Sequence, residues 1–347
     1  MIPSQAYAAY EPGRILKPLR FERRNVLAND VQIDILFCGV CHSDLHFVSG
    51  EWGEVRYPVV PGHEIVGRVE RVGAQVTRFR PGDFVGVGCL VNSCRECSSC
   101  KDGLEQYCEK GATMTYGSVD PKDNSLTQGG YSTNIVVDQD FVVRIPEGID
   151  LERAAPLLCA GITTYSPLRH WKVKDGDRVA VAGLGGLGHM AVKLAAAMGA
   201  DVTVLSTSES KREDAMKLGA HSFAVVKNAD HMARLTGSFD LVLNTISAPH
   251  DYNFYLNLLK RDGTMVLLGL PDPQVVAPFS LVPKRRSLAG SLIGGISETQ
   301  EMLNFCAQHK LAADVEVIPM DQINAAYERL LHADVKYRFV INMRSLK

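Results

Sequence analysis

The sequence predicts an α/β protein of two domains, a β-rich first domain and a doubly wound second domain with six parallel strands. The chain has 347 residues, which is long for a single hydrophobic core. Short strand patterns punctuated by glycine fill roughly the first 150 residues. From Arg178 onward strand and helix patterns alternate, as they do in a parallel sheet covered by helices.

Composition and charge narrow the class of protein. Hydrophobic residues make up 46% of the chain, charged residues 22%, and the net charge is −2. These values are ordinary for a globular protein and give no basic surface for nucleic acid. No apolar run approaches the ~20 residues of a membrane helix, and residues 1–5 lack the features of a secretory signal. We therefore expect a cytoplasmic protein that binds neither nucleic acid nor membrane.

The β-rich domain is predicted from alternating and glycine-bounded apolar runs. Strands are expected at 31–36, 65–73, 84–88 and 131–143, and a helix at 154–161.

One group of metal-binding residues lies around the turns of this domain. A catalytic zinc takes three protein ligands and leaves a fourth position open. We propose that these ligands are Cys41, His63 and Cys159. Each cysteine alone would more often be a small buried apolar residue. The imidazole and carboxylate groups nearby in the sequence favour the metal.

The neighbours of these ligands receive roles from general zinc chemistry. Asp44 is the candidate acceptor for the second N–H of His63, and Glu64 could approach the metal when the fourth ligand leaves. Ser43 could hydrogen-bond a zinc-bound oxygen, and His46 could then carry a proton to solvent. The alternative for all four is that they are ordinary turn residues.

A second group is a compact cysteine loop. Cys94, Cys97, Cys100 and Cys108 have the spacing C-x2-C-x2-C-x7-C, which favours a closed structural zinc site. An iron–sulfur cluster is the competing metal, although Glu109 stands where ferredoxin motifs have proline. Disulfides or free thiols are the remaining alternatives.

The second domain carries a glycine-rich turn between a strand at 179–182 and a helix at 189–198. The turn reads G-x-G-x-x-G and is followed by a strand at 202–205, the context of the dinucleotide-binding Rossmann fold. A glycine-rich turn without a dinucleotide is the alternative. Further strands expected at 223–226, 241–244, 265–269 and 287–293 complete six. Helices at 298–309 and 322–332 and a strand at 338–341 follow.

The end of the second strand predicts the cofactor. NAD-binding proteins usually have an acid there for the ribose 2′-hydroxyl. This chain has Ser206, Thr207 and Ser208, with Lys211 close behind, which suits a 2′-phosphate and predicts NADP(H). The nearby Glu209 is explained as a capping box with Ser206. Zinc and a nicotinamide together imply hydride transfer, and we expect reduction of aldehydes to be the working direction.

These motifs carry a resemblance to a known family. The chain resembles the zinc-containing medium-chain alcohol dehydrogenases, particularly the bacterial NADPH-dependent aldehyde reductases of the cinnamyl-alcohol-dehydrogenase branch. The resemblance runs essentially end to end. Its most specific segments are 38–44, 61–64, the four-cysteine loop, 156–165, 183–188 and 290–295.

The resemblance implies a GroES-like catalytic domain at 1–154, a Rossmann domain at 155–290 and a segment at 291–347 that returns to the first domain. It assigns Cys41, His63 and Cys159 to the catalytic zinc, Glu64 as an alternating ligand, and Ser43 and His46 to a proton relay. It implies a homodimer joined through the cofactor domains. The residues it assigns to the cofactor are Gly183, Gly185, Gly186, Leu187, Gly188, Ser206, Thr207, Ser208 and Lys211, with Thr163, Ser291 and Ile293 near the nicotinamide and Arg338 near the pyrophosphate.

The substrate pocket has the weakest sequence signal. Trp52, Leu90, Met114 and Ile293 are candidates to line it, although each is equally well explained as a core residue. Two other functions stay open from the sequence. One is a non-catalytic zinc- and NADPH-binding protein, such as a redox sensor, and the other is a zinc-free quinone reductase.

Overall fold

A computed structural model describes residues 1–346, and these fall into two compact units. Unit 1 comprises Met1–Cys159 and Gly294–Lys347, and unit 2 comprises Ala160–Ile293. The divisions come after residues 159 and 293, against the expected 154 and 290. Cys159 therefore belongs to unit 1.

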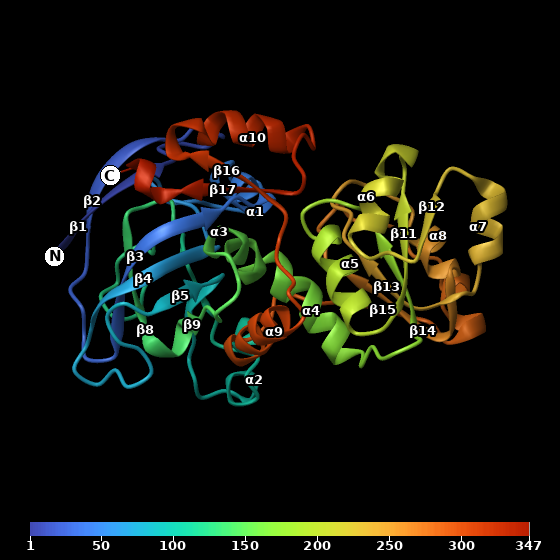
Figure 1. Cartoon of the computed structure of the whole chain (residues 1–347), viewed down its shortest axis with the longest axis horizontal. Helices are drawn as coiled ribbons and strands as arrows, with labels where there is room; N and C mark the ends of the chain where they lie inside the picture. The colour runs from blue at the N-terminus through green and yellow to red at the C-terminus, as the bar shows by residue number, and fades with distance from the viewer. Residues whose placement is uncertain (347) are drawn as a thin grey trace. The chain divides into compact units, whose positions relative to one another are not determined.

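Unit 1 is built on a seven-stranded sheet (Figure 1). Its strands, in spatial order, are β16 (Val315–Pro319), β17 (Arg338–Asn342), β3 (Asp30–Gly39), β4 (Ile65–Val72), β5 (Phe84–Val87) and β9 (Val143–Arg144), with β8 (Asn134–Asp138) paired to β3. The strands predicted at 31–36, 65–73, 84–88 and 338–341 are confirmed. β17 pairs antiparallel with β3, so the end of the chain completes the sheet that its beginning started.

Two predictions in unit 1 are wrong. The strand expected over 131–143 is interrupted by η2 (Gln139–Phe141), because the Asp138 carboxylate accepts a hydrogen bond from the Asp140 N–H and caps a turn there. The helix expected at 154–161 is instead a break between helices. Pro156, which lacks an N–H, lies in the short turn η3 (Ala155–Leu158), which separates α3 (Leu151–Ala154) from α4 (Ala160–His170).

Unit 1 contains further strands and helices. They are the hairpin β1 (Ile2–Ala8) and β2 (Lys17–Arg23), the pair β6 (Leu90–Asn92) and β7 (Thr113–Met114), and the helices α1 (His42–Val48), α2 (Ser98–Lys101), η1 (Glu105–Tyr107), α9 (Ile296–Gln308), η7 (Met320–Gln322), α10 (Ile323–Leu331) and η8 (Met343–Leu346). α9 and α10 confirm the predicted C-terminal helices, whereas α1 was not predicted.

Unit 2 is a six-stranded parallel sheet. Its order is β12 (Ser222–Val225), β11 (Asp201–Ser206), β10 (Arg178–Ala182), β13 (Phe239–Asn244), β14 (Leu259–Leu267) and β15 (Ser287–Gly290). Numbered along the chain this is 3-2-1-4-5-6, the order of the dinucleotide fold, so the predicted doubly wound domain is confirmed.

The helices of unit 2 are α4, α5 (Gly188–Ala197), α6 (Arg212–Lys217), α7 (Ala229–Leu235) and α8 (Tyr252–Asn257), and its short turns are η4 (Glu209–Lys211), η5 (Pro278–Ser280) and η6 (Val282–Lys284). α5 and α8 cover opposite faces of the sheet (Figure 1). Across residues 1–346, the structure contains no helix with the length and apolar character that crossing a bilayer requires.

Candidate metal centres and cofactor loop

The β3–β4 pairing brings Cys41 and His63 together. The two strands are antiparallel, with Cys38 opposite Ile65, and the Gly39 N–H donates to the Glu64 carbonyl at 2.9 Å. Residues just after β3 therefore lie beside residues just before β4. Cys41 follows β3 as the N-cap of α1, and His63 precedes β4.

Cys159 completes the first ligand set within unit 1. Its Sγ lies 4.0 Å from the Cys41 Sγ. One donor atom from each of Cys41, His63, Glu64 and Cys159 lies within 4.8 Å of the others, and all four residues are buried. Two thiols, one imidazole and one carboxylate at this spacing are a donor set that suits zinc. The Glu64 Oε2 atom is also buried without a hydrogen-bond partner among the described residues, as expected of an oxygen that faces a metal.

Glu64 is held by an arginine from the far end of the chain. Arg338, on β17, forms a buried ion pair with its Oε1. Burial raises the pKa of Glu64 to about 7, although the Arg338 charge opposes the rise. The resemblance assigned Arg338 to the cofactor; in unit 1 its Nη2 binds Glu64 while its buried Nε has no partner among the described residues.

Asp44 sets the orientation of His63. The Nδ1 atom of His63 lies 3.1 Å from the Asp44 carboxylate, which is completely buried. A carboxylate accepts the Nδ1 proton, so the lone pair of His63 resides on Nε2 and is available to a metal.

The residues predicted to relay a proton occupy α1 and the turn after it. The Ser43 Oγ lies 3.6 Å from the Cys41 Sγ. His46 Nδ1 lies 2.5 Å from the Glu51 carboxylate, and its ring stacks on Trp52 with centroids 5.2 Å apart. Within residues 1–346 no direct hydrogen bond joins Ser43 to His46. Sequence reasoning missed Glu51, which nothing but its closeness to His46 in the chain could have indicated.

The four-cysteine loop brings its thiols together as the spacing predicted. Their sulfur atoms all lie within 4.8 Å of one another, with Cys94 and Cys100 3.8 Å apart. Hydrogen bonds from the backbone N–H groups of Glu96 and Cys97 lower the pKa of the Cys94 thiol to about 6. Four thiols with a stabilised thiolate suit a structural zinc.

The glycine loop of unit 2 has the geometry that a pyrophosphate requires. Gly183 follows β10 with a φ of +93°, and a Cβ on Gly188 would lie 2.1 Å from the Gly183 carbonyl oxygen. A Cβ on Gly185 would meet nothing within 4 Å, so this position is open to an approaching ligand. The three glycines thus serve the tight turn, the ligand approach and the helix packing.

The tip of β11 presents hydroxyls and a lysine. Ser206 is buried, Thr207 is exposed, and the Lys211 ammonium donates to the Leu184 carbonyl at 3.0 Å. The capping box between Ser206 and Glu209 is wrong.

The N-cap of the short helix η4 (Glu209–Lys211) is Ser208, and α6 begins only at Arg212. Glu209 instead forms an ion pair with Arg212. The other predicted cofactor residues also belong to unit 2, with Thr163 buried on α4 and Ser291 and Ile293 half-buried after β15.

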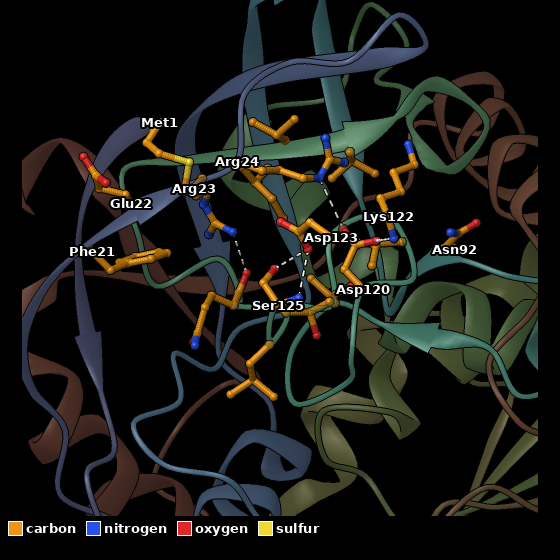
Figure 2. A pocket seen from close by; sticks show the side chains of 18 residues that line it. Met1, Phe21, Glu22, Arg23, Arg24, Asn92, Asp120, Lys122, Asp123 and Ser125 are labelled. Carbon is orange, nitrogen blue, oxygen red and sulfur yellow. Dashed lines mark hydrogen bonds and ion pairs between the residues drawn. The ribbon is translucent and has the colours of Figure 1, made fainter.

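The predicted pocket residues differ in exposure. Leu90 is 2% exposed, whereas Trp52 and Met114 are 51% and 42% exposed. A cavity of about 220 Å³ does exist in unit 1, between β2 and the loop at 120–128 (Figure 2). None of these three residues lines it. Of its cations, Arg24 and Lys122 are paired with acids at Asp30, Asp120 and Asp138, and Arg23 donates to the Gln128 and Gly129 carbonyls.

Comparison with known proteins agrees with this architecture. Residues 27–147 match the alcohol dehydrogenase GroES-like domain, and residues 186–308 match the zinc-binding dehydrogenase domain. The chain is 58% identical to NADP-dependent alcohol dehydrogenase C of Mycobacterium bovis, with 98% of this chain and 99% of the relative covered. It is 56% identical to the aldehyde reductase YahK of Escherichia coli, with 99% of each covered.

A solved structure of CAD from Helicobacter pylori complexed with NADP(H) superposes with a TM-score of 0.93 at 44% identity, covering 99% of both chains. With both domain families matched over most of its length, the chain belongs to the zinc-containing medium-chain alcohol dehydrogenase family.

Proposed function

We propose that this enzyme reduces aldehydes to primary alcohols with NADPH, reversibly and over a broad aromatic and aliphatic range. One observation carries the proposal. Of the four clustered donors, Glu64 is held by Arg338, which leaves Cys41, His63 and Cys159 as the three ligands of an open zinc site. The relatives named above, an NADP-dependent alcohol dehydrogenase and an aldehyde reductase, support the same reaction.

Each residue of the site has a part in this reaction. Zinc bound there would polarise the substrate carbonyl, and NADPH would supply the hydride. Asp44 keeps the Nε2 atom of His63 available as a ligand. Ser43 would deliver a proton to the oxygen of the reduced carbonyl, and His46, which contacts Glu51, would return that proton from solvent through a bridging water, since the two side chains share no direct hydrogen bond among residues 1–346.

The hydroxyls at the tip of β11 support NADPH as the cofactor. A 2′-phosphate would receive hydrogen bonds from Ser206, Thr207, Ser208 and Lys211, and Glu209 is engaged by Arg212. Charge-assisted bonds contribute roughly 1.5–3 kcal/mol each, so NADPH should exceed NADH in kcat/KM by at least about tenfold. Ser206→Asp should remove much of that preference by repulsion. Ser222→Asp should not, because Ser222 begins β12, whereas Ser206 pairs with Val225 at the other end of that strand. Equal efficiency of wild type with both cofactors would contradict the assignment.

A substrate panel tests the reaction itself. With NADPH, benzaldehyde, cinnamaldehyde and hexanal should all be reduced, and acetophenone poorly, because a second carbon substituent crowds the reacting carbon. Acetophenone matching the aldehydes in kcat/KM, or no aldehyde being reduced, would overturn the proposal. Zinc measured in the same preparation should be two atoms per chain. A zinc-bound but inactive chain would favour the redox-sensor alternative, and an active zinc-free chain a quinone reductase.

We also propose a homodimer joined through unit 2. β15 is an edge strand of its sheet. The residues around it include exposed apolar side chains at Leu270, Val275, Phe279 and Val282, which are 71–86% exposed. An unpaired edge beside an apolar surface favours pairing with a second copy. Light scattering should give twice the chain mass, and Phe279→Asp should lower it. No disulfide joins the cysteines of residues 1–346, which suits a reducing compartment and so supports a cytoplasmic location.

A further inference from the structure

The Asp44 carboxylate accepts hydrogen bonds from five donors. Oδ1 lies 3.1 Å from His63 Nδ1 and accepts from the Gly62 N–H at 3.1 Å and the Tyr116 hydroxyl at 2.8 Å. Oδ2 accepts from the Cys41 N–H at 2.9 Å and the Tyr131 hydroxyl at 3.2 Å. The two backbone donors belong to a zinc-ligand candidate and to the residue before another. Asp44 therefore joins both ligand-bearing segments.

Four of these five donors are neutral, and no lysine or arginine among the described residues pairs with Asp44. This arrangement has a chemical consequence for His63. A nearby fixed cation would neutralise Asp44 and weaken its pull on the Nδ1 proton. Neutral donors stabilise the buried carboxylate while leaving its charge directed at His63.

Among the side chains that bind Asp44, Tyr116 is also in contact with His63. Its hydroxyl lies 3.3 Å from His63 Nδ1 as well as 2.8 Å from Asp44, and its ring contacts the His63 ring with centroids 5.8 Å apart. The Phe47 ring packs edge-on against Tyr116 at 5.0 Å. The phenol is thus fixed in a position where it holds both partners of the Asp44–His63 contact.

Tyr131 holds the opposite oxygen and packs against the backbone that leads into His63. It is fully buried, and a Cβ on Gly62 would lie 2.5 Å from its ring. Gly62 also has a φ of +101°, so only glycine allows this close approach. Tyr57 is a half-buried phenol of unit 1 outside this cluster, and its hydroxyl donates to the Val48 carbonyl at 2.9 Å.

We propose that Tyr116 and Tyr131 are positioning residues, whose hydroxyls lock the Asp44 carboxylate so that His63 is held ready to bind the catalytic metal. This inference rests on the proposed zinc site and deepens it. Without the two hydroxyls, Asp44 keeps its backbone donors but can rotate, and the Nε2 atom of His63 is no longer held in one direction.

The test is metal retention, measured as the rate at which purified protein transfers zinc to a chromophoric chelator. The kinetic phase that Cys41→Ala lacks identifies the Cys41 site. Tyr116→Phe and Tyr131→Phe should each accelerate that phase by about tenfold, at the low end of the 10–100-fold cost of losing such supporting partners. Both should lower kcat for benzaldehyde while the KM for NADPH stays unchanged, because unit 2 is untouched.

Tyr57→Phe is the matched control. It removes the same atom from a phenol of unit 1 whose hydroxyl donates to the Val48 carbonyl and not to Asp44, so zinc release and kcat should equal those of wild type. The proposal is overturned if both other variants behave like Tyr57→Phe. If wild type has no phase that Cys41→Ala removes, the zinc assignment and this inference fall together. If one variant fails to fold, the other decides the outcome alone.

Discussion

The two candidate metal sites of unit 1, both of which contain cysteines, are built in opposite ways. The four-cysteine site comes from one loop between residues 94 and 108, and three of its cysteines are partly exposed. The buried site draws Cys41, His63 and Cys159 from separate segments and depends on Arg338 from β17. A closed site needs only a loop that brings four thiols together. An open site has one coordination position without a protein ligand. The surrounding fold must therefore hold the other three ligands in place.

The largest effect should come from Cys41→Ala. Loss of a catalytic zinc removes several kcal/mol of transition-state stabilisation, so kcat/KM should fall by at least about a thousandfold. Elemental analysis should find one zinc per chain and circular dichroism an intact fold. Cys306→Ala, a buried cysteine outside both sites, serves as the control. Full activity in Cys41→Ala would contradict the assignment of a catalytic metal to the buried site.

Cys97→Ser should instead act on stability. Loss of a structural metal belongs to the changes that cost about 4–5 kcal/mol or more. For a unit of this size that corresponds to a Tm lower by roughly 8–20 °C. Calorimetry on zinc-loaded protein measures it, and aldehyde reduction at low temperature should persist. An unchanged Tm would mean that the loop does not hold a structural metal.

The two sites should also differ in thiol reactivity once zinc is removed with a chelator. The pKa of Cys94 is lowered to about 6, so its reactive thiolate is present above that pH and lost below it. Iodoacetamide labelling of Cys94 followed by mass spectrometry should be half-maximal near pH 6. Cys41 is 9% exposed and should be labelled much more slowly. Faster labelling of Cys41 would show that the buried site opens when the metal leaves.

The smallest effect is expected for His46→Ala, which affects only the proton's exit from the buried site. Water can replace a relay, so kcat should fall by about 3–10-fold, less than the ~100-fold typical of direct acid–base catalysis. The pH dependence of kcat should shift, and added imidazole should restore part of the rate. His309→Ala, on an exposed histidine after α9, is the control. An unchanged pH profile would exclude His46 from the relay.

Local patterns were enough to predict much of the fold and the four-cysteine loop, whereas Cys41 and Cys159 are 118 residues apart. The six strands of unit 2 and the four-cysteine loop have signatures within a few residues, so periodicity and spacing were enough. The short helix α1 has no such signature, because seven residues cannot show a helical period. The capping box failed because a matching pair of residue types does not say which residue begins the helix.

The contacts that hold the buried site could not be predicted from sequence patterns. Arg338 is 274 residues from Glu64, and Tyr116 and Tyr131 are 72 and 87 residues from Asp44. Nothing local marks these partners, since a tyrosine beside glycines reads equally well as core. They are visible only once β3, β4 and β17 are paired.

The placement of Arg338 on β17 also bears on how the enzyme is made. β17 pairs with β3, yet the ribosome completes all of unit 2 between these strands. At about 5–20 residues per second, the 274 residues from Glu64 to Arg338 take roughly 15–55 s to synthesise. Throughout that time the nascent first segment carries Glu64 without its guanidinium partner and β3 without its last neighbour. Unit 2, which is continuous in the chain, can fold as soon as it has emerged from the ribosome. The cofactor domain is therefore ready first, and the candidate metal centre gains Arg338 only after unit 2 has been synthesised.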